Sequence, residues 1–331
     1  MLLFMDGFDH YASGDGTEKW DAFGAISTSS PAPRTGAGRA GGVMYKVVPA
    51  GDSTCIYGIA VHAVGSFSIN TTYGASNGNQ ACVNITADGR IQYRQEYSGG
   101  TLLGETAAGT FRFNLWNYLE VKMLLSQTVG TCTIKLNGAT VLTLTGLDNC
   151  YQANTNWNGW YTGGGGSLSI DDFYICDGTG SVNNDFLGEC RVVTLLPQTD
   201  AVAAGSNANF TPSTGTDHGA LVDEAAPNDD TDYLSSSTVN HVDSWNYPAL
   251  GYTGTIKGVQ MSLSAKKTDS GTRAIAAVAR PASTNRVHAT NHYLSTAYMY
   301  WMSLWENNPE DSAAWEVADI DGAEFGVKVT V

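Results

Sequence analysis

Residues 169–185 read SIDDFYICDGTGSVNND, and four aspartates lie within this short stretch. Two of them, Asp171 and Asp172, are adjacent and precede the aromatic pair Phe173-Tyr174. Carboxylates gathered in this way suit three interpretations, which are a pair of catalytic acids, a metal site, or polar residues at the end of a strand. The choice among them decides whether the chain is expected to be an enzyme.

Catalysis by the aspartate pair requires two carboxylates that converge on one bond, as in a glycosidase. Adjacent side chains of a strand point to opposite faces, so Asp171 and Asp172 are expected not to converge. We interpret them as hydrogen-bonding residues at a sheet edge. Glu120 has Lys122 as its same-face neighbour and is expected to form a solvated pair with it. Nucleophile motifs, phosphate-binding loops and H-E-x-x-H spacing do not occur, so the sequence predicts no enzyme.

A calcium site is the second interpretation, because Asp177, Thr179 and Asp185 offer oxygen ligands along one loop. The glycine and the bidentate glutamate of an EF-hand are missing at their required positions. A polar turn explains the pattern equally well, so calcium remains an alternative and no other cofactor is indicated. The same two alternatives apply to Asp229, Asp230 and Asp232.

An aromatic loop supplies the candidate recognition surface. Residues 150–167 read CYQANTNWNGWYTGGGGS, with Trp157, Trp160 and Tyr161 among Asn and Gly. Aromatic faces stack on sugar rings and amides pair with sugar hydroxyls, so these three residues are candidates for glycan binding or for a subunit contact. The alternative is that the aromatic side chains fold back onto the core of the domain.

Composition excludes several classes of partner. The chain has 331 residues and a net charge of −15, whereas binding to nucleic acid requires a basic face. Lysine and arginine form no cluster suited to an anionic membrane. The apolar run before Asp6 is too short for a signal peptide or a membrane span, so we expect synthesis in a cytoplasm. The six cysteines show no C-x-x-C spacing and are expected to be free thiols, or to pair only after the protein leaves the cell.

Period-two alternation predicts strands almost throughout the chain. Apolar and polar residues alternate over 119–125 and 131–136, and Asn137-Gly138 is a strong hairpin signal between the second segment and the strand 141–144. Shorter β-rich segments precede them, and Asp88-Gly89 marks another hairpin. Further alternating strands are predicted at 259–265, 275–279, 298–304 and 324–331. The expected fold class is therefore all-β, with two β-sandwich, jelly-roll-like domains.

The first half resembles the concanavalin A-like lectin/glucanase superfamily, which includes laminin-G-like jelly rolls. The resemblance is carried by FMDGFDHY with Trp20, by Trp116–Leu125 with the following Asn-Gly hairpin, and by the closing strand SIDDFYICD. It implies a jelly roll over residues 1–185. The Glu-x-Asp-x-x-Glu motif of the superfamily's glucanases is absent, which argues against a glycoside hydrolase of that type.

The second half, residues 186–331, is similar to a module of tailed-bacteriophage virion proteins. The matching segments, in order, are FLGECRVVTLLP, NDDTDYLSSST, KKTDSGTRAIAAVARP and the ending from YWMSLWENN onward. The resemblance implies a second β-sandwich that serves in oligomerisation or virion attachment. It implies no catalytic residues.

These observations together predict a non-enzymatic structural protein on the outer surface of a bacteriophage particle, in capsid decoration, neck, tail or fibre. The virion resemblance implies other virion proteins as partners and a homo-oligomer, with a trimer as the expected state. A host-surface glycan is a further expected partner. The alternatives are a carbohydrate-binding adhesin module and, from another class, a glycoside hydrolase.

Overall fold

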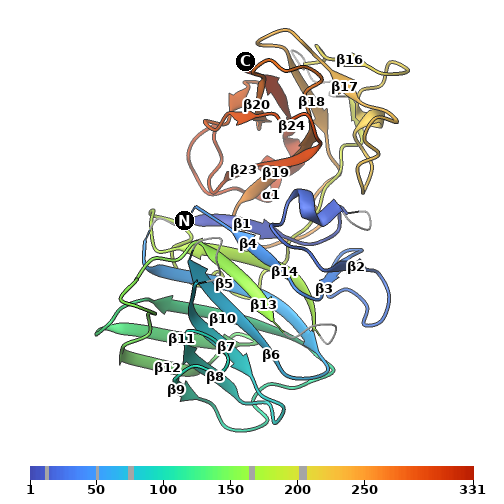
Figure 1. Ribbon diagram of the computed structural model, residues 1–331. Coiled ribbons are helices and arrows are strands. Elements are labelled where there is room, and N and C mark those ends of the chain that lie inside the picture. The colour runs from blue at the N-terminus through green and yellow to red at the C-terminus, as the bar shows by residue number, and fades with distance from the viewer. Residues whose placement is uncertain (12–14, 50–51, 74–77, 164–167, 201–206) are drawn as a thin grey trace. The chain divides into compact units, whose positions relative to one another are not determined.

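The structure is a computed structural model that describes residues 1–331 apart from 12–14, 50–51, 74–77, 164–167 and 201–206. The chain forms two compact units, residues 1–193 and 194–331 (Figure 1). Sheets dominate both units, which confirms the predicted all-β class. The division lies beyond the predicted boundary at residue 185, because the next segment packs on the first unit.

The first sheet of unit 1 has eight strands. Seven of them follow the order β12 (Ala139–Leu147), β11 (Gly130–Leu136), β10 (Trp116–Leu124), β5 (Thr54–Ala63), β14 (Leu168–Asp177), β3 (Arg39–Gly41) and β2 (Ala25–Ser27). The eighth, β1 (Leu2–Asp6), pairs with the C-terminal half of β14, while β3 pairs with its N-terminal half. The register of β14 shifts between Asp171 and Tyr174, so a bulge separates the two pairings.

A short 3-10 helix, η1 (Asp15–Glu18), follows β1 in the chain. The second sheet of unit 1 has six strands. The strand order is β4 (Tyr45–Val47), β13 (Gly159–Gly163), β6 (Phe67–Tyr73), β7 (Gly78–Ile85), β8 (Ile91–Gln95) and β9 (Leu102–Glu105). The two sheets pack face to face: Trp160 of β13 lies 4.5 Å from Phe173 of β14 between ring centroids, and the Tyr93 hydroxyl of β8 is 3.8 Å from the Met123 sulfur of β10. Unit 1 is thus a sandwich of antiparallel sheets.

The predicted meander is present. Strands β10, β11 and β12 pair in sequence, and Asn137 and Gly138 both adopt positive φ (49° and 77°) in the turn that joins the last two. Asn and Gly tolerate this conformation, which matches the right-handed twist of the strands. The Asp88-Gly89 hairpin between β7 and β8 is also confirmed.

The N-terminal motif FMDGFDHY is organised around the buried carboxylate of Asp6. One oxygen accepts hydrogen bonds from the Tyr11 hydroxyl and from Trp20 Nε1 (2.8 Å), and the ammonium of Lys19 lies 3.4 Å away. Burial opposes ionisation, but Lys19 and the hydrogen bonds hold the pKa of Asp6 below its usual value. Asp6 therefore fixes Trp20 in the core of unit 1.

Unit 2 also has two main sheets. Its six-stranded sheet follows the order β15 (Thr199–Asp200), β18 (Val242–Asn246), β24 (Glu324–Val329), β20 (Ala274–Arg280) and β21 (Arg286–Val287), with β22 (His292–Tyr293) also paired to β20. The pair β19 (Val259–Ala265) and β23 (Met299–Trp305) forms the second sheet, and β16 (Thr211–Pro212) pairs with β17 (Leu234–Ser235). Two short helices, η3 (Gly219–Leu221) and α1 (Val317–Gly322), complete the described elements.

The core of unit 2 lies between these sheets. Trp245, Ile275 and Phe325 from the larger sheet form one buried cluster with Met261 and Trp305 from the smaller one. The rings of Trp305 and Phe325 are 6.4 Å apart between centroids. The strands expected at 259–265, 275–279, 298–304 and 324–331 all occur. The alternating apolar residues of the first two supply this core as expected, whereas β23 turns Trp301 and Trp305 into the core and not the alternating set Tyr298, Tyr300, Met302 and Leu304.

Candidate functional site

The two aspartates of β14 accept hydrogen bonds from the same two residues, Arg34 and Thr35, contrary to the expectation that their side chains diverge. Asp171 Oδ2 accepts the backbone N–H groups of Arg34 (2.8 Å) and Thr35 (3.2 Å). Asp172 accepts the Arg34 guanidinium at 2.6 Å and the Thr35 hydroxyl at 2.7 Å. The prediction was wrong here because Asp172 lies in the bulge with a φ of 48°, where strict alternation ends.

Burial decides what the aspartate pair does. Both residues are 0% exposed, so no substrate reaches them. Burial and the charge of Asp172 raise the pKa of Asp171 to about 7, although three backbone N–H donors oppose the shift. The pair acts as a structural clamp that holds residues 34–35 on β14.

Glu120 also differs from its prediction as a solvated residue. It is 1% exposed and accepts hydrogen bonds from the Tyr174 hydroxyl (2.7 Å) and the Gly188 N–H (2.8 Å). Its expected partner Lys122 instead pairs with Asp185 at 3.0 Å. The prediction failed because residues 186–193, which follow β14 in the chain, cover this part of the sheet.

The aromatic loop must be corrected at two of its three candidate residues. Trp157 is 2% exposed and donates its indole N–H to the Thr54 carbonyl at 3.0 Å, and Trp160 is 0% exposed against Phe173. Both indoles fill the core and are out of reach of a glycan or a second subunit. Alternation along β13 turns Tyr161 to the opposite face, where it is partly exposed.

The predicted calcium ligands have other partners. Asp177 Oδ1 accepts the N–H (3.0 Å) and the hydroxyl (2.6 Å) of Thr179, and the amino group of Met1 lies 3.2 Å from the same oxygen. Asp185 pairs with Lys122. Within the described residues, no three His, Cys, Asp or Glu side chains are grouped so as to hold a metal ion. This geometry favours the polar-turn interpretation, and calcium binding stays a prediction.

The outward face of the six-stranded sheet carries polar side chains that the sequence patterns did not single out. Its strands place Ile69, Val83 and Tyr93 in the core, so their sequence neighbours point outward. Cross-strand pairing aligns these outward residues in two rows, one through Asn70 and one through Asn84. We call this surface the outer polar face; its residues are Ser68, Asn70, Asn84, Gln92, Arg94, Glu105 and Tyr161. Cys82, in the same row as Asn70, is 0% exposed, and Asn70 and Gln92 are themselves largely buried.

Gln92 is the centre of a hydrogen-bonded network on the outer polar face. Its side-chain oxygen accepts from Asn84 Nδ2 (3.0 Å) and Arg94 Nε (2.9 Å), and its Nε2 donates to Glu105 at 2.8 Å. Arg90 donates to the other oxygen of Glu105 at 3.2 Å. The network fixes donors and acceptors from three neighbouring strands in one orientation.

Asn70 adds a polar group without a partner to the outer polar face. Its residue is 5% exposed, and its side-chain oxygen meets no hydrogen-bond donor in the described part of the chain. Tyr161 is its direct neighbour on β13. A buried acceptor of this kind is costly unless something donates to it. The alternating polar residues of 68–72, 84 and 92–94 were the sequence signal for this surface.

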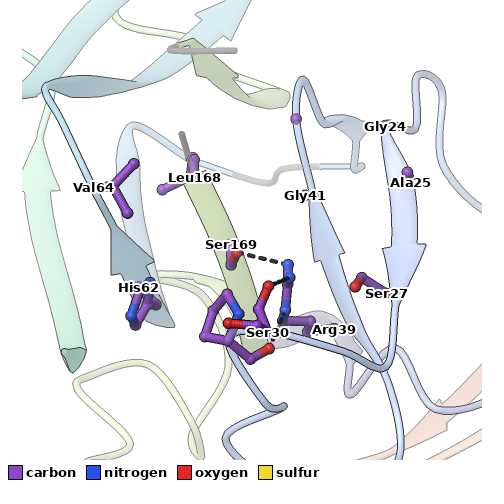
Figure 2. A pocket seen from close by; sticks show the side chains of 12 residues that line it. Gly24, Ala25, Ser27, Ser30, Arg39, Gly41, His62, Val64, Leu168 and Ser169 are labelled. Carbon is purple, nitrogen blue, oxygen red and sulfur yellow. Dashed lines mark hydrogen bonds between the residues drawn. The ribbon is translucent and has the colours of Figure 1, made fainter. Parts of the chain in front are cut away.

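A separate cavity of about 450 Å³ lies on the first sheet (Figure 2). We call it the Arg39 pocket, after the guanidinium that lines it. His62, Ser169, Gly41 and Ala25 are successive cross-strand neighbours of β5, β14, β3 and β2 along its wall. The other lining residues are Gly24, Ser27, Ser30, Pro31, Gly42, Val64 and Leu168.

Comparison with known proteins gives weak structural likenesses only. No family model and no curated protein sequence matches the chain. The galectin LEC-6 of Caenorhabditis elegans is similar with a TM-score of 0.30 and 14% identity, over 40% of this chain and 89% of that one. The carbohydrate-binding module CBM66 of Bacillus subtilis is similar with a TM-score of 0.28 and 11% identity, over 46% and 86%. We infer no ligand from likenesses of this strength, and the bacteriophage resemblance stays a prediction.

All six cysteines lie in described segments and are free thiols, five of them buried. This matches the expectation of free thiols that followed from their spacing. No helix in the described segments is both long and apolar enough to cross a membrane.

Proposed function

We propose that the protein is a non-enzymatic structural protein of a bacteriophage particle whose first unit binds carbohydrate through the outer polar face. The virion role rests on the sequence resemblance of residues 186–331. The carbohydrate role rests on one observation, the network in which Gln92 joins Asn84, Arg94 and Glu105 across three strands. Assembly as a homo-oligomer with other virion proteins, and exposure on the outer surface, belong to the same proposal.

The chemistry of the network suits sugar hydroxyls. A hydroxyl both donates and accepts, and the network offers Arg94 as a donor, Glu105 as an acceptor and two amides that do both. Tyr161 supplies an apolar ring with a polar tip at the other end of the row that contains Asn70 and Arg94. Adjacent strands are about 4.8 Å apart, so the residues from β7 to β9 span roughly 10 Å, enough for a short oligosaccharide.

A glycan array followed by calorimetry tests the carbohydrate role. The wild-type protein should bind a subset of glycans, and Arg94→Ala should weaken that binding about ten-fold or more, because hydrogen bonds from charged groups are the stronger ones. Arg112→Ala is the matched control, since Arg112 is an exposed arginine outside the outer polar face. Binding that is lost equally in both variants, or no binding to any glycan, would refute the assignment.

The virion role needs a separate test. Antibodies against the protein should label intact particles of the phage that encodes it, at a fixed position on the particle surface. Light scattering should give a mass of several chains, with three as the expected number. Absence from purified particles would remove the virion role and leave the carbohydrate role standing.

A further inference from the structure

The Arg39 pocket contains a buried cation that lacks a direct counter-ion. Arg39 is 7% exposed, and no carboxylate of the described residues lies within 4.0 Å of its guanidinium. Asp171 acts on it only at longer range, and its oxygens accept the backbone N–H groups of Arg34, Thr35 and Asp172. An unpaired buried charge is unusual in a chain with 32 acidic and 17 basic residues.

The guanidinium is held firmly and still has donors to spare. Its Nε donates to the Pro31 carbonyl (2.7 Å), one terminal nitrogen donates to Ser169 Oγ (2.6 Å), and the other donates to the Ser30 carbonyl (3.0 Å), as Figure 2 shows in part. An arginine has five N–H groups, so one remains on each terminal nitrogen. Neutral acceptors have thus oriented the cation without neutralising it.

The walls of the pocket are formed by two strands whose backbones approach closely, by a histidine ring and by an apolar rim. A Cβ at Gly24 would lie 1.8 Å from the Gly41 carbonyl, so only glycine permits β2 and β3 to approach here. His62 stands edge to face against Trp116, with ring centroids 5.7 Å apart, and presents a second ring with polar atoms to the cavity. Val64, which is 60% exposed, supplies an apolar rim.

From these features we propose that the Arg39 pocket binds the carboxylate of a small hydroxylated molecule, of the size and chemistry of an acidic monosaccharide. The two remaining N–H groups of Arg39 donate hydrogen bonds to the two carboxylate oxygens of the ligand. A planar guanidinium is well suited to this bidentate pairing. Ser27 and His62 are placed for the hydroxyl groups of the ligand, and the cavity of about 450 Å³ is within the usual range for small-molecule sites. The pocket belongs to the first sheet, so this site is independent of the outer polar face.

Calorimetric titration of the full chain with four probes tests the proposal. Glucuronic acid and N-acetylneuraminic acid carry the carboxylate on a sugar, glucose is the neutral counterpart, and acetate is the carboxylate alone. The two acidic sugars should bind, whereas glucose and acetate should bind at least about ten-fold more weakly, because glucose lacks the charged contact to Arg39 and acetate lacks the hydroxyl contacts. Salt should weaken the binding of the acidic sugars.

Two variants and one control locate the binding. Arg39→Lys keeps the charge but removes the fork, and should weaken acidic-sugar binding about ten-fold. Val64→Trp fills the rim from an exposed position, so it should abolish binding with little change in melting temperature even if Arg39→Lys disturbs the fold. Arg273→Ala, at an exposed arginine of unit 2 that belongs to neither candidate site, should leave acidic-sugar binding unchanged. Binding of glucose or acetate as tight as that of the acidic sugars, binding unaffected by Val64→Trp, or no binding at millimolar concentration would each overturn the proposal.

Discussion

Asp171 and Asp172 are adjacent in β14, yet their carboxylates accept hydrogen bonds from the same two residues, Arg34 and Thr35. The bulge that permits this lies where the edge of β14 passes from pairing with β3 to pairing with β1. The clamp therefore closes the stretch of this edge that lies between the two strand pairings. Burying two carboxylates side by side is unfavourable, and the positive charge of the Arg34 guanidinium offsets part of this cost.

The first prediction concerns the pH dependence of the clamp. The pKa of Asp171 is raised to about 7 in the folded protein, above the value of 3.8 expected for the unfolded chain. A raised pKa means that the folded state holds its proton longer, so this carboxyl contributes most stability below about pH 4 and loses that contribution as the pH rises through 7. The total change is up to about 4 kcal/mol.

The Asp171→Asn variant isolates this effect, because an amide does not titrate. Urea unfolding of both proteins should be measured from about pH 4 to pH 8. We expect the wild type's stability, relative to the variant's, to fall steadily over this range. A difference that is constant or grows with pH would mean that the N–H groups of Arg34 and Thr35 keep Asp171 ionised in the folded protein, and that burial does not raise its pKa.

The second prediction concerns the segment 186–193. Its backbone donates to Glu120 from Gly188 (2.8 Å) and to Asp172 from Val192 (2.9 Å). Each hydrogen bond contributes on the order of 1 kcal/mol, and hydrogen bonds to charged groups contribute more, so a fragment of residues 1–193 should be more stable than one of residues 1–185 by about 3 kcal/mol. Thermal melting of the two fragments is a sufficient measurement, and equal melting temperatures would show that the segment only rests on the sheet.

Much of the strand arrangement was predictable because it depends on short-range sequence patterns. The alternation over 119–125 and 131–136 and the Asn137-Gly138 turn specify β10, β11 and the hairpin from β11 to β12 without reference to the rest of the chain. The bulge at Asp172 was not predictable in this way. It depends on which strands pair with β14, and residues far apart in the sequence decide that.

The candidate site was predicted less well, and for a related reason. The sequence does not distinguish the roles of Trp160 and Tyr161, but β13 directs Trp160 into the core and Tyr161 outward. The strand pattern predicts an exposed Glu120, but residues 186–193 cover its side chain. The outer polar face emerges only when three strands place Asn84, Gln92 and Glu105 side by side. Faces of strands follow from periodicity, but what covers or joins them follows from tertiary structure.

The third prediction is that the protein does not hydrolyse glycosidic bonds. Asp171 and Asp172 are inaccessible, and the sequence lacks the Glu-x-Asp-x-x-Glu motif of glucanases. Incubation of the protein with a panel of polysaccharides should release no reducing ends above the blank. A signal that disappears when one Asp or Glu is replaced would establish an enzyme and refute this expectation.

The fourth prediction separates the residues of the aromatic loop by their effect on stability. Trp160→Ala and Trp157→Ala each empty a large space in the core of unit 1, and truncations of this kind cost roughly 3–5 kcal/mol. Tyr161→Ala is the matched control from the same loop and strand. Because Tyr161 faces outward and is partly exposed, its loss should cost less than about 1 kcal/mol.

Thermal melts of the three variants, each compared with the wild type, give the answer before any binding assay. We expect the two tryptophan variants to melt early or fail to fold, and Tyr161→Ala to melt close to the wild type. Glycan binding should then be measured on Tyr161→Ala alone, since it keeps the fold and removes the ring next to Asn70. Tryptophan variants that melt like the wild type would mean that the indoles are free to act as a recognition surface, and would restore the interpretation that burial now excludes.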